Sequence, residues 1–344
     1  MTRPDHFFRR PALGAGLLLL LIGALGFTVF WILKRTGPDH FVAPSGGSAA
    51  INRAIAKCAE TGGEVRLGAG TYVCKEPIIL RHSNVTLRGA GDATRLVLAD
   101  KANCPVLIIG DEAKDPRHKV TGVRVSDLTI DGNRENQDVE CWEGACDTGE
   151  KTVIRSNGIT LRRAVGVTVE RVTILRCRSG GLVTEKGCRR LTVRGLTASD
   201  HEFDGLACYE TEDSLFTELF LHDNPGAGIS TDLQFNGNVI ANAMLLRNGT
   251  HGIFMRDSNR NLMQAVYIRD SGRQGIFIDQ VDKKIETGAC GNSFTGLTIE
   301  RSQGAAVRIN APSCKDTLFT GAQFFDNKEG ISEAEPGLAE ARAE

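Results

Sequence analysis

Apolar residues recur with a fixed period through the middle of the chain. A glycine followed at once by an aliphatic residue returns every 23 or 24 residues, at Gly158, Gly181, Gly205, Gly228, Gly252 and Gly275. A repeat of roughly 20 to 50 residues is typical of a solenoid or another array of stacked units. Helical spacing is missing inside the repeat, so we expect each unit to be a coil of short strands.

The residues after each glycine alternate between apolar and other types, as they do in a strand with one buried face. The first and third positions are mostly apolar, as in Ile253 and Met255. Further apolar positions near Val167 and Val172, with their equivalents, predict a second and a third strand in each repeat. Three short strands per repeat make one coil of a parallel β-helix, an all-β fold whose stacked aliphatic residues fill the cylinder. We expect about ten coils in residues 49–330. Leucine-rich repeats are the alternative at this period, but their signature is absent.

The start of this region has a pattern of its own. Ser48 and the alanine- and isoleucine-rich residues after it predict a capping helix to about Glu60. Next come Gly62-Gly63-Glu64-Val65-Arg66-Leu67, then Gly70-Thr71-Tyr72, then Asn84-Val85-Thr86-Leu87-Arg88-Gly89. This order resembles the opening of the pectate-lyase superfamily, and the resemblance covers roughly residues 41–330. It implies a single-stranded right-handed parallel β-helix. It leaves the reaction open, because the superfamily holds lyases, hydrolases, epimerases and non-enzymes.

An uninterrupted apolar stretch of 23 residues runs from Pro11 to Leu33, with basic residues on both flanks. About 20 apolar residues cross a bilayer, and no convincing cleavage site follows the stretch. We expect residues 1–35 to be a cytoplasmic tip and a transmembrane signal anchor, 36–48 a linker, and 331–344 an acidic tail. A long cleaved signal peptide is the alternative. Either reading places the body outside the cytoplasm, in the periplasm or at the cell surface.

Ten cysteines in the chain fit an oxidising compartment. We expect one disulfide between Cys58 and Cys74, tying the cap to the solenoid. We expect a second between Cys290 and Cys314, which lie 24 residues apart, or one repeat. Cys141 and Cys146 form a local C-x4-C pair, which offers too few ligands for a zinc site.

The formal net charge is −1, so no global field favours nucleic acid. We expect a polysaccharide partner, membrane contact through the N-terminal helix, no nucleic acid, and a monomer.

Two segments break the period. Residues 131–157 form a long polar insertion that contains Trp142 and enters just before the Gly158 strand. Residues 280–290 form a shorter insertion that leaves just after the Gly275 strand. Long loops in compact domains are often functional. We therefore expect an elongated ligand to bind on the face between these two insertions.

Outward positions of the strand after each glycine gather polar and aromatic residues on that face. Because the coils stack in register, residues far apart in sequence share one patch. The candidate catalytic residues are Asp204, Tyr209, Asp232, His251, Arg256 and Asp279. The candidate substrate-binding residues are Phe254, Phe277, Glu185 and Trp142. The alternative for the alternating acidic and basic positions is a surface charge ladder that contributes little. For the two phenylalanines it is coverage by an insertion.

Two chemistries fit this patch. In a uronate lyase or C5-epimerase, Arg256 would neutralise the substrate carboxylate, and His251 or Tyr209 would act as base or acid. In a glycoside hydrolase, two carboxylates flank the bond, and Asp232 and Asp279 lie two coils apart, about 9.5 Å between backbones. We favour the lyase or epimerase class, because Arg256 and His251 suit an anionic sugar. The competing class is a non-catalytic glycan-binding or adhesive scaffold.

Motifs of characterised superfamily members match only in part. Polygalacturonase-like hydrolases carry N-x-D, D-D, G-H-G and R-x-K, whereas this chain has Asp204-Gly205 and His251-Gly252, and Arg256 is followed by Asp257 and Ser258. Calcium-dependent pectate lyases cluster carboxylates, and Ca2+ is the one ion that the three aspartates suggest, although Arg256 between them would compete for it. We expect no other cofactor.

Overall fold

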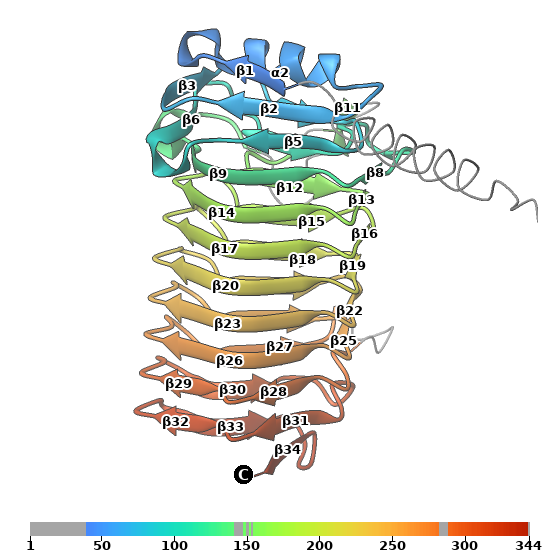
Figure 1. Cartoon of the computed structure of the whole chain (residues 1–344). Coiled ribbons are helices and arrows are strands. Elements are labelled where there is room, and N and C mark those ends of the chain that lie inside the picture. The colour runs from blue at the N-terminus through green and yellow to red at the C-terminus, as the bar shows by residue number, and fades with distance from the viewer. Residues whose placement is uncertain (1–38, 141–146, 149–150, 153, 282–287, 343–344) are drawn as a thin grey trace, which may run out of the picture.

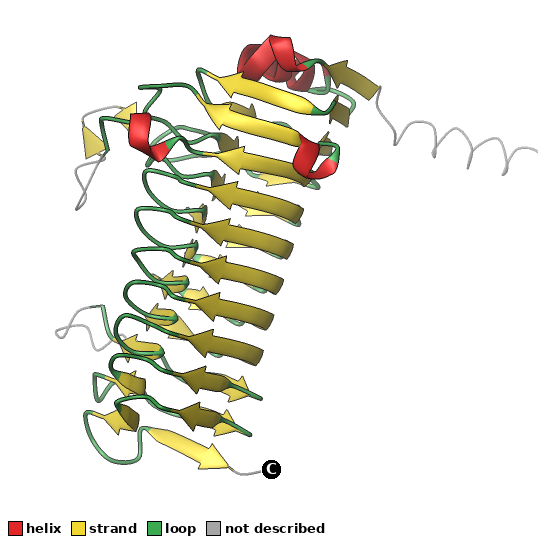
Figure 2. Cartoon of the chain, turned by 90° about the vertical axis from the view of Figure 1, so that its left-hand side faces the viewer, coloured by secondary structure: helices red, strands yellow, loops and turns green. Residues whose placement is uncertain are grey.

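The computed structural model describes residues 39–140, 147–148, 151–152, 154–281 and 288–342. These residues form one column of stacked coils (Figure 1). The longest path of paired strands runs through twelve strands from β1 to β34, so the column has about twelve coils rather than the expected ten. The prediction of a parallel β-helix is confirmed. In Figure 2 the long strands stack on one side of the column, and loops gather along its opposite edge.

Sheet A contains 16 strands and forms the broadest face of the column. Its strands are Asp39–Val42 (β1), Gly63–Leu67 (β2), Gly70–Cys74 (β3), Val85–Arg88 (β5), Thr94–Leu98 (β6), Arg124–Asp131 (β9), Thr168–Leu175 (β14), Thr192–Ser199 (β17), Leu215–His222 (β20), Val239–Leu246 (β23), Leu262–Arg269 (β26), Ser293–Thr295 (β28), Thr298–Glu300 (β29), Thr317–Thr320 (β31), Gln323–Phe325 (β32) and Ala339–Arg342 (β34).

Two further sheets, of ten and six strands, form the other sides of the column. Sheet B contains Ile78–Leu80 (β4), Leu107–Ile109 (β7), Ile159–Arg162 (β12), Leu182–Glu185 (β15), Leu206–Tyr209 (β18), Ile229–Asp232 (β21), Ile253–Arg256 (β24), Ile276–Asp279 (β27), Ala305–Ile309 (β30) and Glu329–Glu333 (β33). Sheet C contains Val120–Thr121 (β8), Ala164–Val165 (β13), Cys188–Arg189 (β16), Thr211–Glu212 (β19), Phe235–Asn236 (β22) and Ser258–Asn259 (β25). A small hairpin pairs Asp147–Thr148 (β10) with Lys151–Thr152 (β11).

The second and third predicted strands of each repeat are one strand. β14 pairs with β17 on both sides of Arg171, which has φ 51° and no partner in the register. One left-handed residue bends the strand without ending it, so the prediction of two separate strands was wrong. The third side of the coil is the two-residue strand of sheet C, which is too short for the hydrophobic pattern to reveal.

The alternation of 23 and 24 residues has a structural cause in the turn between sheets B and C. Glu210 alone joins β18 to β19, whereas Leu233 and Gln234 join β21 to β22. Lys186 and Gly187 likewise join β15 to β16. All five residues have a positive φ. The longer coils therefore carry one extra left-handed residue at this corner, while the strands keep their lengths.

The recurring glycine is required by close packing inside the coil. A Cβ atom on Gly252 would lie 2.4 Å from the Ile268 side chain and 2.7 Å from the carbonyl oxygen of Gly275. Such contacts leave no room for a side chain. The aliphatic residue after each glycine points into the cylinder, and Ile253 and Ile276 are fully buried. The glycine thus allows successive coils to approach, and its neighbour fills the core.

The N-terminal end is closed by helix α2 (Gly47–Lys57), which is amphipathic and packs Ile51 and Ile55 on the first coil. Short 3-10 helices occupy Pro44–Gly46 (η1), Gly91–Ala93 (η2) and Arg134–Asn136 (η3). The capping helix is confirmed, but it begins before Ser48, whose hydroxyl accepts a hydrogen bond from the Lys75 amide at 3.2 Å. The expected N-cap therefore ties the helix to the adjacent strand instead.

The expected Cys58–Cys74 disulfide was wrong, because both thiols are free. The bond from Lys75 to Ser48 places Cys74 beside the first turn of α2. Cys58 follows the last turn of the same helix, ten residues or roughly 15 Å further along its axis. A disulfide needs Cα atoms within about 7 Å, so the two cysteines sit at opposite ends of the cap.

The expected Cys290–Cys314 disulfide was also wrong, and both residues are free thiols. The prediction aligned Phe294 with Leu318, but β28 pairs Phe294 with Phe319. The offset here is 25 residues, so Cys314 is one position out of register with Cys290. The Ala289 amide N–H donates to the Cys314 thiol at 3.5 Å, so Cys314 lies opposite Ala289 rather than opposite Cys290. Cys314 is accordingly buried, while Cys290 is half-buried and its thiol lies 3.0 Å from the Ser313 carbonyl oxygen.

Some predictions fall outside the described residues. These are the apolar segment 11–33, Trp142, and the Cys141 and Cys146 pair. Within the described ranges, no helix is both long and apolar enough to span a membrane. The paired strands reach beyond the 49–330 range predicted for the β-helix, since β1 lies in the expected linker and β34 in the expected tail.

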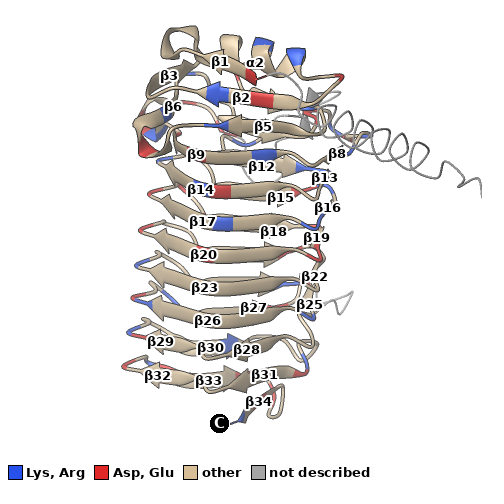
Figure 3. Cartoon of the chain, in the orientation of Figure 1, with Lys and Arg blue, Asp and Glu red and all other residues tan. Residues whose placement is uncertain are grey.

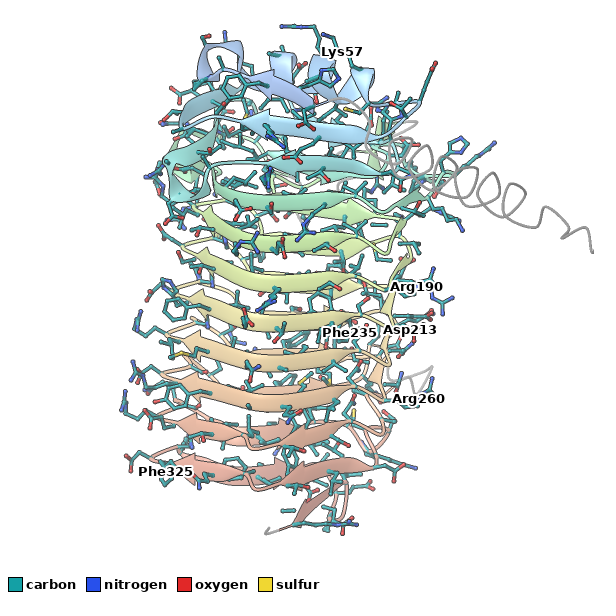
Figure 4. All side chains as sticks on the ribbon, viewed as in Figure 1. Lys57, Arg190, Asp213, Phe235, Arg260 and Phe325 are labelled. Atoms are coloured by element: carbon teal, nitrogen blue, oxygen red, sulfur yellow. The ribbon has the colours of Figure 1, made fainter. Side chains whose placement is uncertain are left out.

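Charged residues gather at the turns of the column, as Figure 3 shows. Many form ion pairs between neighbouring coils, such as Arg247 with Asp223 at 2.7 Å and Arg171 with Asp127 at 2.6 Å. Another corner carries the residues Arg190, Asp213 and Arg260 above one another (Figure 4), each with a positive φ. The Arg247 pair lies at a turn, and the Arg171 pair lies at the bend within β9 and β14; surface pairs of this kind contribute little individually.

Inside the turns, buried amides form ladders. The backbone N–H of Asn224 donates to the side-chain Oδ1 of Asn248 at 3.3 Å. The side-chain Nδ2 of Asn248 donates to the backbone carbonyl of Leu221 at 3.1 Å. Asn224 and Asn248 are each 1% exposed, so the backbone groups of these corners are satisfied by side chains rather than by water. The turn at Asn224 is structural, as its residue type predicts.

Candidate functional site

Sheet B carries the column of candidate residues on its outward face. The register places Arg162 opposite Glu185, Tyr209 opposite Asp232, and Arg256 opposite Asp279. Parallel neighbours lie about 4.8 Å apart. The last position of each strand therefore forms one row across six successive coils. The stacking inferred from the repeat period is present.

On the two middle strands of sheet B, β18 and β21, the outward position between the two strand ends carries a small side chain. Ala207 and Ser230 occupy the central outward positions of β18 and β21, where Phe254 and Phe277 stand on β24 and β27. Asp204 lies just before β18, and Tyr209 ends it. The small side chains leave these two polar groups without a bulky residue between them.

Asp204 is held in an environment that disfavours its charge. The Ala227 amide N–H donates to its Oδ1 at 2.6 Å, but burial raises the pKa of Asp204 to about 6. A carboxyl with that pKa exchanges protons near neutral pH, which is a property of general acids and bases.

Tyr209 lies within electrostatic reach of two carboxylates. Burial is the main cause that raises the pKa of its hydroxyl, and the charges of Asp204 and then Asp232 raise it further. The phenol therefore remains protonated at neutral pH. This hydroxyl links the two ends of the strands into one site.

Asp232 and Arg256 form an ion pair between adjacent coils. Nε of Arg256 donates to Oδ2 of Asp232 at 3.1 Å, and its Nη2 donates to the same oxygen. Asp232 is 4% exposed, whereas the side chain of Arg256 is 35% exposed. The pair thus offers a buried anion whose charge is compensated and a cation that still faces outward.

An aromatic group adjoins this pair. The Phe254 and Phe277 rings stack at 5.8 Å with an angle of 12° between their planes. The guanidinium of Arg256 lies 5.1 Å from the centre of the Phe254 ring. Both phenylalanines are half-buried. Adjacent flat rings at the surface fit the apolar C–H face of a sugar, and a guanidinium over one of them adds a cation–π contact.

His251 joins the aromatic group from the other end of the strands. Its ring lies 5.1 Å from Phe277 and 5.6 Å from Phe254, and its Nε2 donates to Oε1 of Gln274 at 3.0 Å. Burial lowers the pKa of His251 to about 4, although the bond to Gln274 opposes this. The imidazole is therefore neutral at pH 7, and because its Nε2 carries the proton, the lone pair is on Nδ1.

Two candidates stand apart from this group. Oδ2 of Asp279 accepts a hydrogen bond from Asn310 at 3.0 Å, at one end of the row. Glu185 lies toward the other end, where its Oε1 pairs with Nε of Arg162 at 2.7 Å. The Asp232 and Asp279 pair considered for hydrolysis is therefore interrupted by Arg256, which binds Asp232. Trp142 lies outside the described residues.

The sequence reasoning missed two arginines. Arg162 is fully buried and donates to the carbonyl oxygens of Asp111 and Ala113, each at 2.8 Å, so it anchors the loop after β7. Arg162 stands four residues after Gly158, as Glu185 stands after Gly181, so including the Gly158 coil in the set of outward positions would have found it. Arg155 lies 5.4 Å above the ring of Phe203 and favours the ionised form of Asp204. No periodic signal marks Arg155, because it belongs to the insertion.

Calcium does not fit the three aspartates as the described coils place them. Arg256 engages Asp232, and Asn310 engages Asp279, so their oxygens do not converge with those of Asp204. Across the described ranges, no three His, Cys, Asp or Glu side chains are grouped to hold a metal ion. A surface hollow beside α2 is lined mainly by small residues and backbone, with Lys75 and Glu76 as its charged members. It lacks the converging polar groups of sheet B.

Comparison with known proteins agrees with this architecture. The sequence family described as "Right handed beta helix region" matches residues 157–290. Mannuronan C5-epimerase AlgE5 of Azotobacter vinelandii is 30% identical over 251 residues, which is 68% of this chain and 24% of that protein. AlgE2 of the same organism is 28% identical over the same share. The chain belongs to the pectate-lyase superfamily. This superfamily member spans about a quarter of the length of the curated relatives that it matches.

Solved structures show the same superfamily fold. The A-module of Azotobacter vinelandii mannuronan C-5 epimerase AlgE4 matches with a TM-score of 0.52 at 16% identity, covering 90% of this chain and 98% of the module. The catalytic domain of a GH87 alpha-1,3-glucanase matches with a TM-score of 0.66 at 15% identity, covering 90% and 58%. ORF18 of Geobacillus virus E2 matches with a TM-score of 0.70 at 16% identity, covering 94% and 64%. At these identities the likeness concerns the fold.

Proposed function

We propose that this protein is a polysaccharide-processing enzyme that acts on uronate sugars as a lyase or C5-epimerase. The observation that carries the proposal is the convergence of Asp204, Tyr209 and the Asp232–Arg256 pair beside the stacked rings of sheet B. The sequence similarity to mannuronan C5-epimerases supports the same class of substrate.

Removal of a proton next to a carboxylate requires a cation, a base and an acid. Arg256 faces outward beside Phe254 and can pair with the substrate carboxylate, which makes the adjacent proton more acidic. His251 is neutral and can take that proton. Tyr209 remains protonated, and its hydroxyl lies within electrostatic reach of both Asp204 and Asp232, so it can return a proton to the sugar. Return to the other face of the sugar gives epimerisation, and loss of the neighbouring glycosidic oxygen gives a lyase product.

A second candidate is a glycoside hydrolase, which one specific observation favours. Asp204 has a pKa raised to about 6, whereas Asp232 lies against a cation. A carboxyl that exchanges its proton near neutral pH, next to a second carboxylate paired with a cation, is an arrangement that can supply the acid and the base of such a reaction. In that reaction Asp204 would protonate the leaving oxygen, and Asp232 would act as base or nucleophile.

A panel of glycans incubated with the full chain separates these reactions. Unsaturated products that absorb ultraviolet light identify a lyase, and new reducing ends without that absorbance identify a hydrolase. Exchange of the C5 proton for deuterium, followed by NMR, identifies an epimerase. The variants R256A and D232N should lose turnover, whereas R260A, at an exposed corner away from sheet B, should retain it. Absence of turnover on every glycan, with binding that depends on the two phenylalanines, would instead establish a glycan-binding scaffold.

The proposed location is outside the cytoplasm, with the apolar segment of residues 11–33 as a membrane anchor. Fractionation of cells expressing the full chain tests both parts. We expect the protein to remain with membranes after high-salt washing, and to be digested by protease added outside the cytoplasmic membrane. Release into the soluble fraction would indicate a cleaved signal peptide.

A further inference from the structure

The turn after Asp232 differs from its neighbours on both sides. Leu233 and Gln234 both have left-handed backbone conformations, with φ 46° and 69°, whereas the adjacent coils use a single residue, Glu210 or Asp257. The turn keeps its backbone hydrogen bonds to the turns of both neighbouring coils. The Glu210 amide donates to the Leu233 carbonyl at 2.8 Å, and the Gln234 amide donates to the Asp257 carbonyl at 2.9 Å. The extra residue is therefore accommodated at the corner without disturbing the neighbouring coils.

Leucine is an unusual residue for this position. A left-handed conformation crowds the Cβ of an L-residue, so asparagine, aspartate and glycine are found there most often. Among the described non-glycine residues with positive φ, Leu233 is the one aliphatic side chain larger than alanine. The comparable two-residue turn, Lys186-Gly187, uses glycine at its second position. Backbone geometry therefore does not explain the choice of leucine.

Packing does not explain it either, because Leu233 is 43% exposed. Its corner neighbours along the column are Glu210 and Asp257, so an apolar side chain stands in water between two acidic ones. A single exposed leucine needs no explanation by itself. An exposed leucine at a left-handed corner does, because the coil requires the conformation there but a polar residue or glycine adopts it at lower cost.

The turn also touches the candidate site directly. The Leu233 amide N–H donates to Oδ1 of Asp232 at 2.8 Å, while the other oxygen of that carboxylate binds Arg256. The same backbone conformation that holds the leucine side chain in water thus orients the buried carboxylate. Leu233 is therefore placed at the edge of the site by covalent and hydrogen-bonded connection to its central ion pair.

We propose that Leu233 is a specificity-determining residue that packs against the C–H face of a sugar bound beside the Asp232–Arg256 pair. This inference rests on the proposed function and adds a rim contact to it. Pyranose rings present apolar C–H groups on their faces, and an aliphatic side chain already held in place binds them with little loss of conformational freedom. The strained turn then lowers the stability of the fold in exchange for substrate binding.

The test uses the full chain with three substitutions at one position. L233G removes both the side chain and the backbone strain, L233N removes the apolar contact but tolerates the conformation, and L233M keeps an apolar side chain. A265G is the matched control, because Ala265 also has a positive φ (52°) but lies in sheet A. The probes are mannuronan and α-1,3-glucan. KM and kcat are measured on whichever is turned over, and thermal midpoints on all variants.

We expect KM to rise about tenfold in L233G and L233N, with kcat little changed, and to remain near the original value in L233M and A265G. The thermal midpoint of L233G should be unchanged or higher by about 1–2 °C. Unchanged KM in L233G and L233N, with turnover intact, overturns the inference alone. A clear drop in the midpoint of L233G also overturns it, by showing that the leucine stabilises the fold. Where neither probe is turned over, the assay uses whichever glycan of the panel is; if no panel glycan is bound or turned over, the proposed function fails and the inference fails with it.

Discussion

Replacing Asp204 by asparagine should stabilise the protein at neutral pH. The pKa of Asp204 is raised from about 4 in an unfolded chain to about 6 in the fold. Below pH 4 the carboxyl is protonated in both states, so it affects stability little. Above pH 6 the folded protein holds an ionised carboxylate in a site that disfavours charge, and stability is lost as pH rises between these values. A difference of about two pKa units corresponds to about 3 kcal/mol.

The D204N variant removes the charge and keeps an oxygen that can accept the Ala227 amide hydrogen bond. We therefore expect a gain of about 2–3 kcal/mol at pH 8 and little gain at pH 4, measured by urea denaturation monitored by circular dichroism. The thermal midpoint at pH 8 should rise by a few degrees. Turnover should fall at the same time, because Asp204 is a candidate acid.

A control with the opposite sign is available at Asp223. The hydrogen bond from Arg247 lowers the pKa of Asp223 to about 2, so its contribution is present above pH 4 and lost as pH falls through 2. D223N should therefore lose a little stability at pH 8, where D204N gains. An equal gain for D204N at both pH values, or a loss at pH 8, would refute the reasoning about burial of Asp204.

Three further substitutions test other parts of the site. R256A leaves the buried carboxylate of Asp232 without its partner, so we expect a loss of about 3 kcal/mol in urea denaturation together with lost turnover. Stability like that of the original protein would show that the ion pair contributes little to the fold. R162M removes the donors that hold the loop after β7, so protease should cut residues 111–119 several times faster than in the original protein. The urea midpoint of unfolding should change less than it does in R256A. Equal cutting rates contradict this anchoring role. F254A and F277A should each weaken glycan binding about tenfold in calorimetry, with kcat less affected; unchanged affinity would mean that an insertion covers the rings.

The repeat period predicted the vertical arrangement of this protein well. Tyr209 and Asp232 are 23 residues apart and meet in the register, because each coil returns the chain to the same face. The inward positions, such as Ile253 and Met255, were equally predictable, since alternation in a strand separates the two faces. The sequence shows that some coils are one residue longer, but it could not show that the extra residue lies at the corner of Leu233 and Gln234. One more left-handed residue lengthens the repeat without changing the hydrophobic pattern of the strands.

Predictions that depended on the exact offset between coils failed. Cys290 and Cys314 matched a 24-residue repeat, but the local offset is 25, which places Cys314 opposite Ala289 instead of Cys290. Arg155 and the loop held by Arg162 could not be located, because neither lies in a repeat whose geometry a neighbour fixes. Loops outside the period take their path from tertiary contacts alone.

The amino-acid sequence by itself determined the parallel β-helix, the face of sheet B that carries polar residues, and the order of those residues along the column. These follow from the alternation within each strand and from the repeat that six successive glycines display. Only the tertiary structure decided which of them interact: that Arg256 binds Asp232 rather than Asp279, that Asp204 is buried enough to hold its proton near pH 6, and that His251 joins the aromatic rings. Burial and pairing depend on the side chains of neighbouring coils, and their directions are set only when those coils have packed together.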